Sequence, residues 1–219
     1  MPFLAENSGI AIHYGRNISD LSPLGSLEKI KGGINIERTN ITNLNGLENI
    51  QMNDGIAIVE NARLTTLDAL LGLRETQVLL LKDNPQLQNL EGLDSLQSVQ
   101  SLRIIRSPLI ENLAPLARLH SIAGLELNGL DNLVSVEALS KIQTLDFLHI
   151  SSNQKLATLA GLDSLRSING TIAVEVIHNP QLVSLAAWKN LRTARRLSIV
   201  NNGQLKSLEG LEKLRKYPA

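Results

Sequence analysis

Four residues with chemically useful side chains recur at one position of the chain's pattern: Arg103, Glu126, His149 and Glu175. Successive members are 23, 23 and 26 residues apart. Carboxylate and imidazole groups are zinc ligands, although strands at this spacing rarely bring three ligands to one point. The same row could instead recognise a partner, or it could be a charge-compensated ladder that keeps a surface soluble. These alternatives depend on the elements that hold the four side chains.

The spacing of these residues belongs to an internal repeat. The phrase apolar-x-x-apolar-x-x-apolar begins at Leu21, Leu44, Leu67, Leu90, Leu113, Val136, Leu159, Leu185 and Leu208. The steps are 23 residues six times running, then 26, then 23. A fixed period of this length is typical of a solenoid, in which neighbouring coils must stack to bury their apolar sides.

Each repeat contains one short strand pattern. The alternation Leu102-Arg103-Ile104 has the period of two expected of a strand with one buried face. Equivalent pairs recur in every repeat, so we expect about nine short parallel strands, one in each repeat of about 23 residues. The period of three that precedes them fits short 3₁₀ turns or extended segments, so few or no long α-helices are expected. The fold class is therefore a mainly β solenoid.

The domain organisation follows from the extent of the repeat. We expect one solenoid over residues 1–219, with residues 1–9 as an N-terminal lead-in and residues 10–217 as the repeats. After most strands comes an Asn, which can bond the backbone of the bend. These Asn residues predict an internal ladder, interrupted at Gly15, Thr39, Ser107 and Leu130.

Side chains on the outer face of the strands are the candidate binding residues. In-register stacking would place Arg103, Glu126, His149 and Glu175 next to one another, about 5 Å apart. Apolar residues at neighbouring outward positions would flank this row. The candidate partner-binding set is Leu80, Arg103, Ile105, Glu126, Phe147, His149, Glu175 and Ile177. Trp188 occupies a slot that Leu fills in the other repeats, so we expect it in the core.

Composition argues against several classes of function. The chain has 21 basic and 21 acidic residues, so it lacks the positive charge of a typical nucleic-acid-binding protein. It has no cysteine, and no catalytic triad or phosphate-cradling glycine loop can be assembled from matching positions. We therefore expect no enzyme activity, no catalytic residues, no cofactor and no metal.

The ends of the sequence leave the compartment open. No stretch approaches the apolar length needed to span a bilayer, and the first residues lack the pattern of a secretion signal. The chain is either cytoplasmic, or at the cell surface or secreted after removal of a leader. The last repeat, from Leu208, stops before its strand, so we expect one of two arrangements: further sequence follows it, or end-to-end or edge self-association with another copy covers the uncapped C-terminal coil.

The repeats resemble two related families. Val99-x-x-Leu102-x-Ile104 is similar to the core of a leucine-rich repeat, and the segment from Leu159 to Ile168 resembles bacterial internalin-type repeats. The tract from Leu27 to Ile36 and the Asn-Pro-Gln-Leu segments at Asn84 and Asn179 resemble receptor L-domains. The usual 23-residue step favours the L-domain pattern, and the lack of cysteine favours a bacterial member. The resemblance implies a right-handed coil that recognises a protein or ligand without catalysis.

The leading expectation is a non-catalytic recognition module that binds a protein or peptide through its sheet face. One alternative is a structural spacer segment of a larger bacterial surface protein. Another is a cytosolic binding protein of the immunity or effector type.

Overall fold

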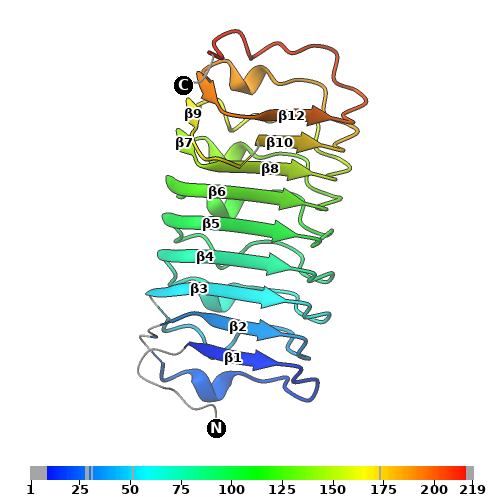
Figure 1. The fold of residues 1–219 in the computed structure, drawn as a ribbon. Coiled ribbons are helices and arrows are strands. Elements are labelled where there is room, and N and C mark those ends of the chain that lie inside the picture. Colours follow the sequence, from blue (N-terminus) through cyan, green and yellow to red (C-terminus); the bar gives the residue numbers. More distant parts are fainter. Residues whose placement is uncertain (1–8, 28–29, 31, 51, 173, 216–219) are drawn as a thin grey trace.

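The protein is a parallel β-solenoid (Figure 1), as the repeat predicts. The structure is a computed structural model, and it describes residues 9–27, 30, 32–50, 52–172 and 174–215. The residues expected to form most of the lead-in, 1–8, and the last four residues lie outside the described part. The main sheet has nine strands in chain order: β1 (Ile10–His13), β2 (Ile34–Glu37), β3 (Met52–Val59), β4 (Glu75–Lys82), β5 (Ser98–Ile105), β6 (Ser121–Asn128), β8 (Phe147–Ser151), β10 (Val174–Ile177) and β12 (Leu197–Val200).

Every strand of this sheet pairs in parallel with its neighbours, and equivalent repeat positions face each other. Leu79 is opposite Leu102, which is opposite Leu125, which is opposite Leu148. The register holds because one face of each strand is buried, and a slip by one residue would move every apolar side chain to the outside.

The core is a single apolar column inside the coils. Leu, Ile and Val side chains from the strands and from the opposite wall fill it, and most are fully buried. Trp188 is 0% exposed in the slot that Leu fills in other coils, which confirms its expected position. Its indole Nε1 is buried and has no hydrogen-bond partner among the described residues.

A second, smaller sheet was not predicted. It consists of β7 (Thr144–Leu145), β9 (Ser167–Ile168) and β11 (Thr193–Ala194), in the order β11-β9-β7. In β3 to β6 the equivalent residues are part of one eight-residue strand. After β6 the strand is interrupted, because residues 146, 169–172 and 195–196 turn the chain between its two halves. The extra residues of the 26-residue coil lie at this interruption, where the Gly170 N–H donates to the Asp146 carbonyl.

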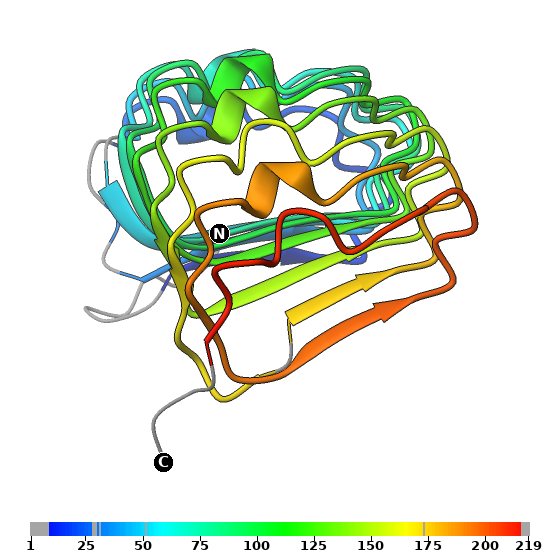
Figure 2. The ribbon, with the colours of Figure 1, turned by 90° about the horizontal axis from the view of Figure 1, so that it is seen from above.

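The wall opposite the main sheet is made of short turns (Figure 2). Five coils contain a three-residue 3₁₀ helix: η1 (Ser22–Leu24), η2 (Asp68–Leu70), η3 (Ala114–Leu116), η4 (Glu137–Leu139) and η5 (Ala186–Trp188). Their three residues per turn match the apolar period of three in this part of the repeat. Within the described ranges, no helix has both the length and the apolar character needed to cross a membrane.

The remaining coils carry a glycine at this wall instead of a helix. Gly46, Gly92, Gly161 and Gly210 have φ between +99° and +107°, a conformation that side-chain-bearing residues rarely adopt. Each lies against the carbonyl of the preceding helical coil; a Cβ on Gly92, for example, would lie 2.1 Å from the Leu67 carbonyl oxygen. The glycine coil therefore packs closely on the helical coil before it.

The corner after each strand has one conformation throughout the stack. The residue that follows each main strand adopts a left-handed conformation, with φ between +48° and +65°. We call these nine residues the corner row: Tyr14, Arg38, Glu60, Asp83, Arg106, Gly129, Ser152, His178 and Asn201. The N–H of each of the first eight donates to the carbonyl of the last residue of the next strand, as from Glu60 to Lys82 at 2.8 Å. This bond offsets part of the conformational cost of the left-handed residue.

The Asn ladder lies directly behind the corner row. Asn84 Oδ1 accepts the Asn61 N–H at 3.1 Å, and Asn84 Nδ2 donates to the Ile58 carbonyl at 2.9 Å. Each ladder Asn thus makes hydrogen bonds to the backbone of the coil before its own. The predicted interruptions at Thr39 and Leu130 are only partial, because the N–H groups of these residues donate to Asn61 and Asn153. The links form two runs, 39–61–84 and 130–153–179–202, separated at Ser107.

Replacing Ser107 by Asn should lengthen the first run by one coil. Ser107 is fully buried, and its hydroxyl has no hydrogen-bond partner among the described residues. By analogy with Asn84, an Asn here would accept the Asn84 N–H and donate to the Leu81 carbonyl. We expect S107N to raise the free energy of unfolding by about 1 kcal/mol, measured by urea denaturation. S107A, which adds neither bond, is the control, and a less stable S107N would contradict the ladder.

Replacing Gly92 by Ala should destabilise the stack. The added Cβ would collide with the Leu67 carbonyl and would have to tolerate a φ of +99°. We expect a loss of about 2 kcal/mol or more in the free energy of unfolding. At Gly203 an added Cβ meets nothing within 4 Å, so G203A should change stability by less than about 0.5 kcal/mol. Equal effects of the two substitutions in the same denaturation assay would refute the close packing of the glycine coil.

Candidate functional site on the sheet face

The structure brings together five of the eight candidate residues in one row. Leu80 is opposite Arg103, Arg103 is opposite Glu126, Glu126 is opposite His149, and His149 is opposite Glu175. They come from β4, β5, β6, β8 and β10, and their side chains are partly or largely exposed on the outer face of the sheet. We call these five residues the central row.

Arg103 links the central row to Phe147. Its guanidinium lies over the Phe147 ring, 5.5 Å from the ring centroid, and its Nε is 3.7 Å from Glu126 Oε2. A cation over an aromatic face is attracted by the ring quadrupole. The Phe147 ring itself covers Gly124, where a Cβ would lie 1.8 Å from the ring. The aromatic ring therefore lies down on the sheet, and Gly124 provides the space for it.

His149 makes polar contacts with two further residues of the sheet face, Glu175 and Ser151. Its Nδ1 is 3.2 Å from Glu175 Oε2, and its Nε2 is 2.7 Å from the Ser151 hydroxyl. The side chains of His149 and Glu175 are 28% and 36% exposed, so a partner can reach both. The arrangement holds the imidazole in a fixed orientation.

Ile105 and Ile177 do not join the central row or each other. They lie in the next outward row, where Asn128 and Ser151 separate them. Both are half-buried. Ile105 and Ile177 are therefore separate apolar residues beside the central row.

The N-terminal part of the sheet face offers a shallow apolar depression that sequence reasoning missed. It has a volume of about 390 Å³, and Ala11, Gly33, Gly55, Ala57 and Val78 are among the residues that line it. Ala57 is opposite Leu80, so the depression adjoins the central row. The signal in the sequence was the run of Gly and Ala at outward positions of β1 to β3.

A zinc site in the central row would need three ligands that point to one place. The side chains of Glu126, His149 and Glu175 are not arranged in this way. Glu126 lies by Arg103, whereas Glu175 lies by His149. Within the part of the chain that the structure describes, no three His, Asp or Glu side chains are grouped to hold a metal ion.

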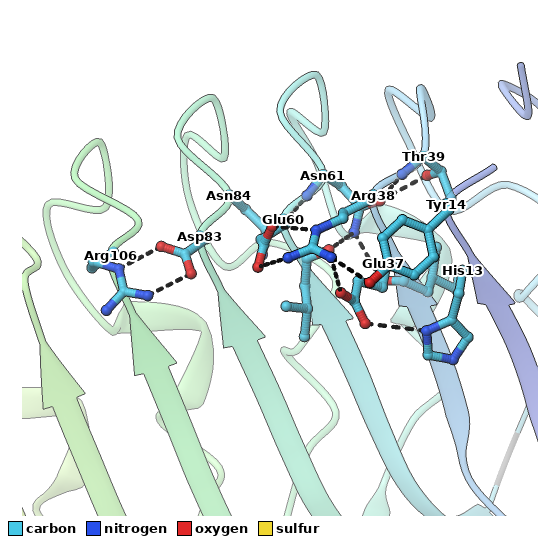
Figure 3. Close-up of polar contacts among 12 residues, drawn as sticks. His13, Tyr14, Glu37, Arg38, Thr39, Glu60, Asn61, Asp83, Asn84 and Arg106 are labelled. Atoms are coloured by element: carbon cyan, nitrogen blue, oxygen red, sulfur yellow. Dashed lines mark hydrogen bonds and ion pairs between the residues drawn. The ribbon is translucent and has the colours of Figure 1, made fainter. Parts of the chain in front are cut away.

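The rim of the sheet face carries an ion-paired cluster, formed by the first part of the corner row (Figure 3). Arg38 donates two hydrogen bonds to Glu60, at 2.5 and 3.0 Å, and its guanidinium also lies over the Tyr14 ring at 4.9 Å. Arg106 donates two to Asp83, at 2.5 and 2.6 Å. The order of charges along the rim is therefore positive, negative, negative, positive.

These bonds alter the acidity of the carboxyl groups. Hydrogen bonds from Arg106 hold the pKa of Asp83 below its usual range, and those from Arg38 lower the pKa of Glu60. The rim charges are thus already compensated within the protein. No sequence pattern marks this cluster, because its side chains face one another only when the left-handed corners stack.

Comparison with known proteins adds no further assignment. No protein-family model, curated protein or solved structure matches this chain. The likeness to leucine-rich repeats and receptor L-domains rests on the residues quoted above and stays an expectation.

The Asp83 pair predicts a pH-dependent difference in stability. Because the folded state lowers the pKa of Asp83, the ionised carboxylate stabilises the fold above about pH 4, and this stabilisation is lost as the pH falls further. D83N should therefore be less stable than the wild type at pH 7, by about 0.5 kcal/mol for an exposed pair. The difference should disappear near pH 2, measured by urea denaturation across the pH range.

Asp131 provides the matched control. It is exposed and makes no ion pair with the described residues. D131N should follow the wild type at every pH, and a D83N curve that does the same would contradict a stabilising Asp83–Arg106 pair.

Proposed function

We propose that the protein is a non-catalytic recognition module that binds a protein or peptide through the outer face of its main sheet. The observation that carries this proposal is the contact of Arg103 with Phe147 above Gly124. It places an aromatic ring and a guanidinium near the middle of a nine-stranded sheet. Arg and aromatic side chains dominate the binding energy of many protein interfaces.

The shape of the face supports a macromolecular partner. The 3₁₀ segments lie on the opposite side of the stack, so they leave the outer face of the sheet uncovered (Figure 2). A nearly flat, exposed sheet suits the broad contact of a protein or peptide better than the enclosure of a small molecule.

The chemistry of the face changes along the stack. The depression over β1 to β3 is apolar, whereas the central row from Arg103 to Glu175 alternates basic and acidic groups. A partner with an apolar segment next to a charged segment would complement both parts. Alternating charges select the orientation of such a partner, because a reversed partner would face like charges.

A triple variant tests the proposal. F147A removes the ring, and R103E with E126R reverses the two charges beside it. These side chains lie outside the core, so the variant should fold, which circular dichroism and urea denaturation will verify. We expect it to lose at least tenfold in affinity for the native partner that wild-type protein captures from an extract of its own organism.

The control carries the same three kinds of change away from the sheet face. Leu71 is 58% exposed beside η2, and Arg63 and Glu91 are exposed. L71A/R63E/E91R should capture the same partner as the wild type. If every captured protein binds the triple sheet-face variant as well as it binds the control, the proposal is wrong. A photo-crosslinking residue in place of Val78, which lines the depression and is 39% exposed, should attach to the partner directly.

A further inference from the structure

Unpaired positive charge accumulates at one bend of the solenoid. This bend leads into the strands and lies on the left of Figure 1, near β7 and β9. Elsewhere, Arg38, Arg103 and Lys189 pair with carboxylates, and exposed cations without an ion pair to the described residues, such as Arg63 and Lys155, lie several coils apart. At the bend, five consecutive coils each supply an exposed cation whose side chain makes no ion pair or hydrogen bond with the described residues: Arg118, Lys141, Arg166, Arg192 and Arg215.

Backbone hydrogen bonds keep three of these cations in register. The Arg192 N–H donates to the Arg166 carbonyl at 2.7 Å, and the Arg215 N–H donates to the Arg192 carbonyl at 2.8 Å. Adjacent parallel strands are about 4.8 Å apart. The charges therefore repeat at short intervals along the stack, although the net charge of the chain is zero.

A hollow opens on the same bend. It has a volume of about 590 Å³, and its polar lining consists of His120, Ser121, Lys141, Gln143, Thr144 and Ser164. The lining thus offers an ammonium, an imidazole, an amide and three hydroxyl groups. His120 Nδ1 donates to the Arg118 carbonyl at 3.2 Å, which leaves Nε2 without a partner among the described residues.

Among the residues that the structure describes, no carboxylate lines this hollow. The acidic residues nearest in sequence, Asp146 and Asp163, are absent from its lining. Asp163 lies 3.9 Å from Lys189, which partly neutralises it. A bound anion would therefore meet donors without a directly opposing charge.

We propose that this hollow binds an oxyanion ligand that carries two or more phosphate or sulfate groups. One group would occupy the hollow, held by Lys141 and the surrounding hydroxyl and amide donors. A second would reach Arg166, one coil further along the stack. Charge-assisted hydrogen bonds from Lys and Arg are the strong contacts to such groups, and the volume is typical of a small-molecule site. This site is separate from the sheet face and does not rest on the proposed function.

Calorimetric titration with tripolyphosphate at low salt tests the site directly. The wild type should bind, and K141Q/R166Q should bind at least tenfold more weakly. Orthophosphate should bind more weakly than tripolyphosphate, because it can occupy only one of the two positions. A sulfated disaccharide of similar charge forms a second arm: whichever ligand binds more tightly identifies the preferred group, and either result supports an oxyanion site.

The control removes equal charge from the opposite bend. Arg63 and Lys155 are exposed and follow the ladder positions Asn61 and Asn153 by two residues. R63Q/K155Q should change the affinity by less than twofold. The proposal is overturned if wild-type protein does not bind millimolar tripolyphosphate, or if both double variants lose affinity equally. It is also overturned if a single-stranded DNA 12-mer binds the wild type and tripolyphosphate does not displace it.

Discussion

Hydrogen bonds between coils are the interaction on which the whole structure depends. A main strand has no partner inside its own coil, so its N–H and C=O groups bond to the strand before and the strand after it. The corner row and the Asn ladder continue the same arrangement beyond the strands, since each connects one coil to the next. The extra residues of the 26-residue coil lie outside the strands, in the loop after β9, where the N–H groups of Asn169 and Gly170 still bond to the coil before.

The sequence was sufficient for the parts of the fold that depend on burial. Leu102 was placed by its alternation with polar residues, and Leu79 and Trp188 by their repeat positions. These predictions succeeded because a buried slot accepts only an apolar side chain of suitable size. The second sheet was missed because Thr144 and Ser167 have no apolar alternation to mark them. The left-handed corners were missed because eight different residue types occupy them, and the stacked backbone alone imposes the conformation.

Parts of the candidate site could be inferred in the same way and others could not. The contiguity of Arg103, Glu126, His149 and Glu175 follows from register, which the repeat length specifies. The position of the Phe147 ring over Gly124 depends on the absence of a Cβ on the neighbouring strand, which is visible only when the two residues are seen side by side. The bend cations were hidden by the neutral total charge, because a sum over the chain does not show how charge is distributed across faces.

Three outward surfaces of one lattice thus differ in chemistry. The sheet face combines an aromatic ring with alternating charges, the rim is neutralised by its own ion pairs, and the bend before the strands keeps its cations free of ion pairs with the described residues. The coil geometry is the same for all three, so substitutions at outward positions can change one surface without disturbing the others.

The alternation of helical and glycine coils makes the structural unit two coils long. Gly46 and Gly92 are 46 residues apart, and each fits against the helical coil that precedes it. In the described part of the chain, only η3 and η4 follow each other without a glycine coil between them. Gain or loss of two coils at a time keeps helical and glycine coils in alternation. Gain or loss of one coil places two coils of the same kind next to each other, as η3 and η4 are here.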